Sequence, residues 1–273
     1  MKIFITGSTG FVGKNLVEYY RDYEVFAHTR AMDISESLEY FKPDIIINCA
    51  AELYKPEDMW IPNVVWTSDC LNYVKANPNT RMVQIGSSAE YGPMPRASKE
   101  TDGIKPVDMY QATKGAATLL SQGYARQYGL DILVARPYSV YGRHEKSHRL
   151  FPRLWQAFFK GEEMKLFNGF HDFIYIDDFV RGIDMLAIST DAPRGDIVNF
   201  GSGLQHSNYE VYEVFKQAAN LPGDSVKLEG HMAKAFESEI WICDTTYAKE
   251  KYKFEIKYSL EEGIKDFIKT AQY

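Results

Sequence analysis

The 273-residue sequence has little that would bind it to nucleic acid or hold it in a membrane. Its formal net charge is −6 and it has no run of basic residues, which argues against sequence-independent binding to nucleic acid or to an anionic lipid surface. No segment approaches the roughly 20 apolar residues of a membrane span. The N-terminal run MKIFITGSTG is too short in apolar residues for a signal peptide. We therefore expect a cytoplasmic protein with no nucleic-acid or membrane partner.

The sequence also lacks the cysteine spacing of a disulfide framework or a zinc site. Cys49, Cys70 and Cys243 are odd in number, far apart and without a C-x-x-C pair. The adjacent Asp177 and Asp178 stand at the expected start of a helix, where acids usually cap the helix and interact with its dipole. We predict no metal site.

The first half of the chain alternates strand and helix patterns with short connections. Strands are expected at 2–6, 24–29, 44–50, 81–87 and 131–137, and helices at 11–21, 63–76 and 108–128. This alternation predicts an α/β fold, a Rossmann-type doubly wound parallel sheet that binds ligands at the carboxyl ends of its strands.

After Pro137 the alternation becomes less regular. Helices are expected at 150–161, 177–189, 208–220 and 258–272, and strands at 172–177 and 197–202. We predict a dinucleotide-binding domain over residues 1–140, to which 172–200 returns. Residues 141–171 and 201–273 would form a smaller C-terminal substrate-binding lobe.

The run TGSTGFVG predicts a phosphate-binding loop between the first strand and the first helix. Its glycines let the backbone turn tightly and approach a pyrophosphate, which the helix N-terminus favours. The residues predicted to hold the cofactor are Gly7, Thr9, Gly10, Phe11, Val12 and Gly13 in the loop, and Ala50, Ala51 and Pro137 at later strand ends.

The end of the second strand bears on which cofactor is bound. NAD-binding folds usually place an acid there for the ribose 2′-hydroxyl, but here Thr29 and Arg30 stand at that point and the next acid is Asp33. An arginine can pair with the extra phosphate of NADP. We therefore favour NADP(H), with Arg30 and Asp33 near the ribose, and keep NAD(H) with a solvated Arg30 as the alternative.

The run MYQATKGAA places Tyr110 and Lys114 on one face of an expected helix. The ammonium can lower the phenol pKa from about 10 toward neutral. Such a tyrosine passes a proton to or from a carbinol oxygen while a nicotinamide, which Tyr110 and Lys114 would also contact, exchanges hydride with its carbon. By itself Y-x-x-x-K is a common surface pattern, so its weight comes from the accompanying motifs.

These motifs occur together with IGSSAEYG (85–92), NCAA (48–51), RPYSVYG (136–142), DFIYIDD (172–178) and NFGSG (199–203). In this order they resemble the extended short-chain dehydrogenase/reductases, particularly the nucleotide-sugar epimerase and reductase branch, over nearly the whole chain. The resemblance implies that Ser87, four positions before Tyr91, polarises a substrate carbonyl beside Tyr110 and Lys114, while Ser88 shapes the pocket. It also implies a nucleotide-sugar substrate and a homodimer built on helices 63–76 and 108–128.

Positions 88 and 89 narrow the reaction within that resemblance. Sugar 4,6-dehydratases carry an Asp-Glu pair where this chain has Ser88 and Ala89, and GDP-fucose synthases use a cysteine where it has Ala89. Alanine moves no proton, so we expect neither dehydration nor double epimerisation. Reduction of a 4-keto sugar, favoured by GSSAEYG and Arg30, remains, as does 4-epimerisation with tightly bound NAD. A reductase of a non-nucleotide ketone or aldehyde and a non-catalytic cofactor-binding regulator are further alternatives.

The expected substrate lobe departs from the family pattern at positions that commonly touch the sugar nucleotide. Ser139 replaces the asparagine of R-P-x-N-V-Y-G, and His171 replaces the arginine before D-F-I-Y-V-D-D. Arg149 stands where another asparagine is usual. The substrate-binding residues predicted on this basis are Ser88, Ala89, Ser139, Arg149, His171 and Lys234, with Arg143 as a further candidate for a diphosphate.

Overall fold

The computed structural model describes residues 1–231 and 240–271. Its internal contacts divide the chain into two compact units. The first unit comprises Met1–Gly92, Glu100–Pro137 and Val180–Asn199, and the second comprises Pro93–Lys99, Tyr138–Phe179 and the described part of Phe200–Tyr273. The sequence-based domain boundaries, with residues 1–140 and 172–200 as one folding domain, stay a prediction.

The first unit is built on a six-stranded sheet with the order β2-β1-β3-β4-β5-β9. Its strands are β1 (Lys2–Thr6), β2 (Glu24–Ala27), β3 (Ile45–Asn48), β4 (Arg81–Ile85), β5 (Ile132–Pro137) and β9 (Ile197–Phe200). β1 pairs in parallel with β2 and β3, and β4 pairs in parallel with β3 and β5. Apart from the half-buried Arg81, the residues of β3 and β4 are buried on both faces and mostly apolar, as in a covered parallel sheet. The prediction of a doubly wound α/β fold is confirmed.

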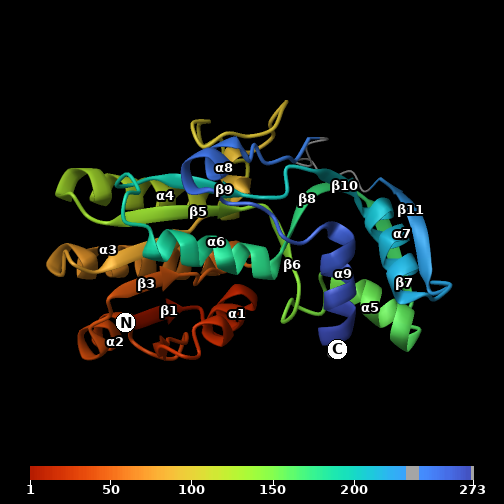
Figure 1. The fold of residues 1–273 in the computed structure, drawn as a ribbon, viewed down its shortest axis with the longest axis horizontal. Helices are drawn as coiled ribbons and strands as arrows, with labels where there is room; N and C mark the ends of the chain where they lie inside the picture. The colour runs from red at the N-terminus through yellow and green to blue at the C-terminus, as the bar shows by residue number, and fades with distance from the viewer. Residues whose placement is uncertain (232–239, 272–273) are drawn as a thin grey trace. The chain divides into compact units, whose positions relative to one another are not determined.

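Helices cover both faces of this sheet (Figure 1). They are α1 (Phe11–Tyr19), α2 (Ile34–Phe41), α3 (Trp66–Ala76), α4 (Met109–Tyr128) and, from residue 180 on, α6 (Ile176–Ile188). α3 packs against both α2 and α4, around a core that includes Leu38, Leu71 and Ala125. The Tyr20 hydroxyl after α1 donates to Asp184 on α6 at 2.8 Å, so these two helices are tied to each other. A turn of π-helix, Ile61–Val65, leads into α3.

The second unit holds two small sheets, one with the order β10-β8-β6 and one pairing β11 with β7. The strands are β6 (Ser139–Tyr141), β7 (Met164–Asn168), β8 (Phe170–Tyr175), β10 (Gln205–Ser207) and β11 (Val226–His231). The helices are α5 (Leu150–Lys160), α7 (Asn208–Ala219), α8 (Thr246–Tyr252) and α9 (Leu260–Thr270).

Aromatic side chains form the core of the second unit. The ring of Phe151 on α5 stacks on Tyr141 at 4.1 Å and contacts Phe173 and Phe267. α9 approaches so closely that a Cβ added at Gly263 would lie 2.1 Å from the Tyr141 hydroxyl. The unit therefore depends on dense packing of rings around short strands.

The expectation that Asp177 or Asp178 caps α6 is wrong. The helix begins at Ile176, so both acids lie in its first turn. Asp178 is buried and accepts the main-chain N–H groups of Lys257 and Tyr258 at 3.0 and 2.9 Å. Asp177 pairs with Arg143 at 2.7 Å. These acids anchor other segments of the second unit. Over the described ranges, no helix has the length and apolar character needed to cross a membrane.

Candidate active site

The glycine loop forms a tight cradle between β1 and α1. Gly7 has a φ of +62°, and the N–H of Gly10 donates to its carbonyl at 2.9 Å. A Cβ at Gly13 would lie 2.2 Å from that carbonyl oxygen, so only glycine fits there. α1 begins after Gly10 without a side-chain cap, which leaves donors in its first turn for a ligand. The loop fits a pyrophosphate by shape and by its donors.

The loop meets the end of β3 at the switch point of the sheet. A Cβ at Gly7 would lie 2.8 Å from the Cα of Ala50. The N–H of Ala50 donates to the Thr6 hydroxyl at 3.0 Å, and that hydroxyl donates to the Asn48 carboxamide. Asn48 in turn donates to Gln84 at the end of β4 at 2.7 Å. Thr6, Asn48 and Gln84 are buried, and sequence reasoning missed them, although a polar residue near the end of three buried strands is a usable signal.

The two residues predicted near the cofactor ribose already have protein partners. Arg30 is 63% exposed and pairs with Glu52 at 3.3 Å. Asp33 caps α2 by accepting the N–H of Glu36 at 2.8 Å. The guanidinium stays accessible to a ligand, whereas the Asp33 carboxylate is occupied in part by its cap.

Ser87 stands at the end of β4, where it caps the short 3₁₀ helix Ser88–Tyr91. Its side chain is buried, and its Oγ accepts the N–H of Ala89 at 3.2 Å. A hydroxyl that accepts a hydrogen bond can still donate its own proton, so Ser87 can donate to a ligand. Ser88 is buried beside it, and Ala89 is half-buried.

Lys114 on α4 is 3% exposed, and its ammonium donates to the carbonyl of Ile85, the last residue of β4. Burial lowers the pKa of Lys114, while the nearby Glu90 and Cys49 raise it. Tyr110 lies one turn earlier on the same helix and is half-buried, within reach of the ammonium by helical geometry. The structure therefore ties the predicted lysine to the end of the strand that precedes Ser87.

The predicted substrate residues of the second unit lie on β6, on β8 and before α5. Ser139 Oγ lies 3.4 Å from His171 Nδ1, so two of the three residues that depart from the family pattern are neighbours. Arg149 donates from Nε to Glu145 at 3.3 Å. Burial raises the pKa of Glu145 to about 7, with Arg149 opposing. Lys234 lies outside the described residues.

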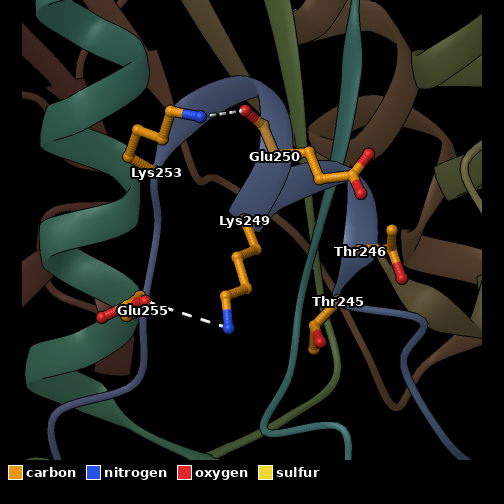
Figure 2. A pocket seen from close by; sticks show the side chains of 6 residues that line it. All are labelled: Thr245, Thr246, Lys249, Glu250, Lys253 and Glu255. Carbon is orange, nitrogen blue, oxygen red and sulfur yellow. Dashed lines mark hydrogen bonds and ion pairs between the residues drawn. The ribbon is translucent and has the colours of Figure 1, made fainter.

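A surface depression of about 690 Å³ lies at α8 in the second unit. Figure 2 shows its six side chains, with Lys249 reaching toward Glu255 in an ion pair of 4.0 Å. None of the predicted cofactor or substrate residues within the described ranges lines it. We therefore do not assign it to the active site.

A glycine cradle at the switch point of a doubly wound sheet defines a dinucleotide-binding α/β protein. Residues 3–201 match the model of the NAD dependent epimerase/dehydratase family. The chain belongs to this family of extended short-chain dehydrogenase/reductases.

Curated relatives align over most of the chain. The low-salt glycan biosynthesis protein Agl12 of Haloferax volcanii is 25% identical and covers 97% of this chain and 96% of its own. The UDP-glucuronate 4-epimerase of Thermodesulfobacterium geofontis is 29% identical over 79% of this chain and 68% of its own. The GDP-6-deoxy-D-talose 4-dehydrogenase of Aggregatibacter actinomycetemcomitans is 27% identical over 78% and 79%.

Solved structures show the same fold over nearly the whole chain. The UDP-glucose 4-epimerase of Thermotoga maritima with UDP-glucose has a TM-score of 0.88 at 21% identity and covers 99% of this chain and 98% of its own. The dTDP-glucose 4,6-dehydratase of Bacillus anthracis with NAD has a TM-score of 0.86 at 20% identity and covers 98% and 96%. At these identities the likeness shows the fold alone.

Proposed function

We propose that the protein is a nucleotide-sugar oxidoreductase that reduces a nucleotide-linked 4-keto-(6-deoxy)hexose. The observation that carries the proposal is the segment Ser87–Ala89 at the end of β4. Ser87 has a hydroxyl proton to donate and lies two residues after the strand whose last carbonyl binds Lys114. Ser88 and Ala89 offer no carboxylate or thiol, so proton transfer depends on Tyr110, and elimination of water has no acid–base pair.

The residues present fit a nicotinamide dinucleotide. The cradle of Gly7, Gly10 and Gly13, in which an added Cβ would strike backbone at Gly13, would hold the pyrophosphate, and Ala50 closes it on one side. When bound, the cofactor supplies the hydride.

The chain's own residues would handle the oxygen of the substrate carbonyl. Ser87 Oγ donates a hydrogen bond to that oxygen, which draws electrons from the carbonyl carbon. Tyr110 then gives the oxygen its proton as the alcohol forms. The Lys114 ammonium stabilises the tyrosinate that is left. Ser87 thus polarises the carbonyl, Tyr110 protonates its oxygen, and Lys114 balances the negative charge on Tyr110.

Two features support NADP(H) and a sugar nucleotide as ligands. Arg30 is exposed and carries a charge that suits a 2′-phosphate. The names of two relatives, a UDP-glucuronate 4-epimerase and a GDP-6-deoxy-D-talose 4-dehydrogenase, indicate substrates linked to UDP and to GDP. A solved structure of the same fold holds UDP-glucose. We propose Ser88, Ala89, Ser139, Arg149 and His171 as the residues that contact the substrate.

A panel assay tests the proposal. Purified protein is incubated with NADPH or NADH and with nucleotide-linked 4-keto-6-deoxyhexoses and hexoses, while cofactor absorbance and sugar products are followed together. We expect NADPH oxidation with the 4-keto sugars and formation of the 4-hydroxy product. Cofactor binding without turnover on any member of the panel contradicts the proposal, and supports a non-nucleotide substrate or a regulator.

A nucleotide-sugar 4-epimerase with tightly bound NAD is the second candidate. The pairing of Arg30 with Glu52 favours it, because an engaged arginine is less free to bind a 2′-phosphate. One relative, 29% identical over 79% of this chain, is a UDP-glucuronate 4-epimerase. In the panel assay this function would appear as interconversion of two sugar epimers without net cofactor turnover, with NAD retained through purification.

We further propose that the protein is a homodimer formed by the helices after β3 and β4. Ile61 and Val65 before α3 and Leu119 on α4 are apolar yet substantially exposed, and α3 packs beside α4. A second copy covering them would remove this apolar surface from water. Mass in solution tests it: we expect a dimer that Leu119→Glu dissociates, and a monomeric active wild type would refute it.

A further inference from the structure

Three short segments of the chain share one capping arrangement. In each, a serine side chain accepts a main-chain N–H of the helix it precedes, and a glutamate three residues later accepts the N–H of that serine. Within the described ranges the pairs are Ser87 with Glu90, Ser207 with Glu210, and Ser259 with Glu262.

Two of these pairs are ordinary helix caps. They begin α7 and α9, helices of 12 and 11 residues, and their glutamates are exposed. Hydrogen bonds from the serines lower the pKa values of Glu210 and Glu262. Such caps stabilise a helix end at the surface.

The pair at Ser87 differs in its surroundings. Glu90 is 0% exposed, and its Oε2 accepts from Nε of Arg136, itself 1% exposed, at 2.8 Å. Burial raises the pKa of Glu90, and the positive charges of Arg136 and Lys114 offset only part of this rise. A buried ion pair is a poor source of stability because desolvation offsets its attraction. The need to cap a helix of only four residues does not explain why a charged pair is buried here.

The other oxygen of Glu90 holds the main chain around Ser87. Oε1 accepts the N–H of Ser87 at 2.7 Å and the hydroxyl of Thr118 on α4 at 3.0 Å. A Cβ at Gly86 would lie 2.7 Å from Oε1, so the carboxylate packs directly against the backbone before Ser87. One side chain thereby links the end of β4 to β5 through Arg136 and to the helix that carries Lys114.

We propose that Glu90 is a positioning residue of the reaction, whose hydrogen bond to the main chain of Ser87 holds the Ser87 hydroxyl in register with Tyr110 and Lys114. Arg136 fixes the carboxylate, and Thr118 and Gly86 set its position. The inference rests on the proposed function, because it takes Ser87 as the group that binds the substrate carbonyl.

The first test is Glu90→Gln, with Glu262→Gln as the matched control from the exposed cap of α9. In Glu90→Gln the new amide must either face the Arg136 guanidinium or turn away from Ser87, so the serine shifts. We expect kcat to fall about 10- to 100-fold with KM within about twofold of wild type, since misplacement by about 1 Å has such effects. Glu262→Gln should keep wild-type kcat and KM. A kcat for Glu90→Gln within twofold of wild type overturns the proposal.

A double-mutant cycle separates positioning from general damage. If Glu90 acts through Ser87, Glu90→Gln should cost little further activity in a Ser87→Ala background, because residues that act as a unit are not additive. The same further loss in both backgrounds overturns the proposal. Asp178→Asn removes another buried carboxylate that accepts main-chain N–H groups, and so shows what lost stability alone does to kcat.

A second variant, which replaces the whole ion pair, tests the proposal even if Glu90→Gln does not fold. Glu90→Met combined with Arg136→Met replaces the pair with apolar side chains and still removes the acceptor of Ser87. It should show the same loss of kcat, and wild-type kcat in this variant overturns the proposal.

Amide hydrogen exchange gives a readout that needs no substrate. Both Glu90 variants should speed exchange at Ser87 and Ala89 at least about tenfold relative to Asp178→Asn, because fixed and buried amides exchange slowly. If the substrate panel shows no turnover, the proposed reaction fails, and unchanged exchange at Ser87 still rejects the positioning role of Glu90.

Discussion

The two units of the chain differ in how far they keep the family pattern. In the first unit the glycine cradle lies between β1 and α1, Ser87 follows β4, and Lys114 lies on α4, as the motifs predict. Lys114 donates a hydrogen bond to the last carbonyl of β4. In the second unit Asp178, part of the run DFIYIDD, anchors the main chain at Lys257. The positions that commonly meet the substrate carry Ser139 and His171 instead of the usual residues. Under the proposed function, the first unit would carry out the hydride transfer and the second unit would differ from the family in substrate recognition.

The largest expected effect lies in the first unit. Tyr110→Phe removes the proton donor and should lower turnover about 1,000-fold while leaving cofactor affinity nearly unchanged, since acid–base catalysis contributes about 10²–10⁴. Tyr128→Phe, at the exposed end of the same helix, is the control and should be silent. Substantial turnover in Tyr110→Phe would break the idea that the first unit keeps the reductase chemistry.

The cofactor cradle gives the next largest effect. Gly13→Ala places a Cβ 2.2 Å from the Gly7 carbonyl oxygen, so the loop must open, and we expect the cofactor Kd to rise about 100-fold. Gly123→Ala on α4 meets no atom within 4 Å and should leave binding intact while favouring the helix by about 1 kcal/mol. Fluorescence titration with NADPH measures the cofactor Kd of both variants. Equal cofactor affinity in the two variants would show that the cradle is not part of the cofactor-binding site.

A substitution in the second unit should change recognition and not chemistry. His171→Ala is expected to raise KM for the sugar nucleotide about tenfold with kcat unchanged, because it removes a contact made equally before and during reaction. His148→Ala, in an exposed position, serves as the control. A fall in kcat at constant KM would place His171 in the chemical step and erase the contrast between the units.

The smallest expected effect concerns the choice of cofactor. Arg30→Ala should reduce the preference for NADPH over NADH about fivefold, the equivalent of roughly 1 kcal/mol for an exposed charge. Arg21→Ala, also exposed, controls for net charge. An unchanged ratio of the two Kd values would favour NAD as the cofactor and with it the epimerase.

Much of the first unit was predictable because its signals are local. The buried strands are mostly apolar runs, and the glycine spacing predicts the tight turn of the loop. α2 was missed because its eight residues show too few turns of a periodic pattern. In the second unit, the three-residue strands β6 and β10 exist through pairing with β8, which no local pattern reveals.

The motifs predict candidate residues of the site, but not the partners of those residues. Ser87, Tyr110 and Lys114 follow from spacing and resemblance, whereas the partnership of Glu90 with Arg136 joins residues 46 positions apart in sequence. Burial of a charged pair depends on what packs around it, and the sequence does not display that. The ion pair of Arg30 with Glu52, from the segment after β3, likewise joins residues that no motif connects. This pair bears on the choice between NAD and NADP.

The order of segments along the chain has a consequence for synthesis. β9 (Ile197–Phe200) adds to β5 at the edge of the main sheet, yet it is translated after residues 138–179 of the second unit. On the ribosome, the first five strands can pair early while the neighbouring site of β9 stays open. Such an unpaired strand edge is prone to wrong association. Nascent chains that stall before residue 200 should therefore be the ones that depend most on chaperones.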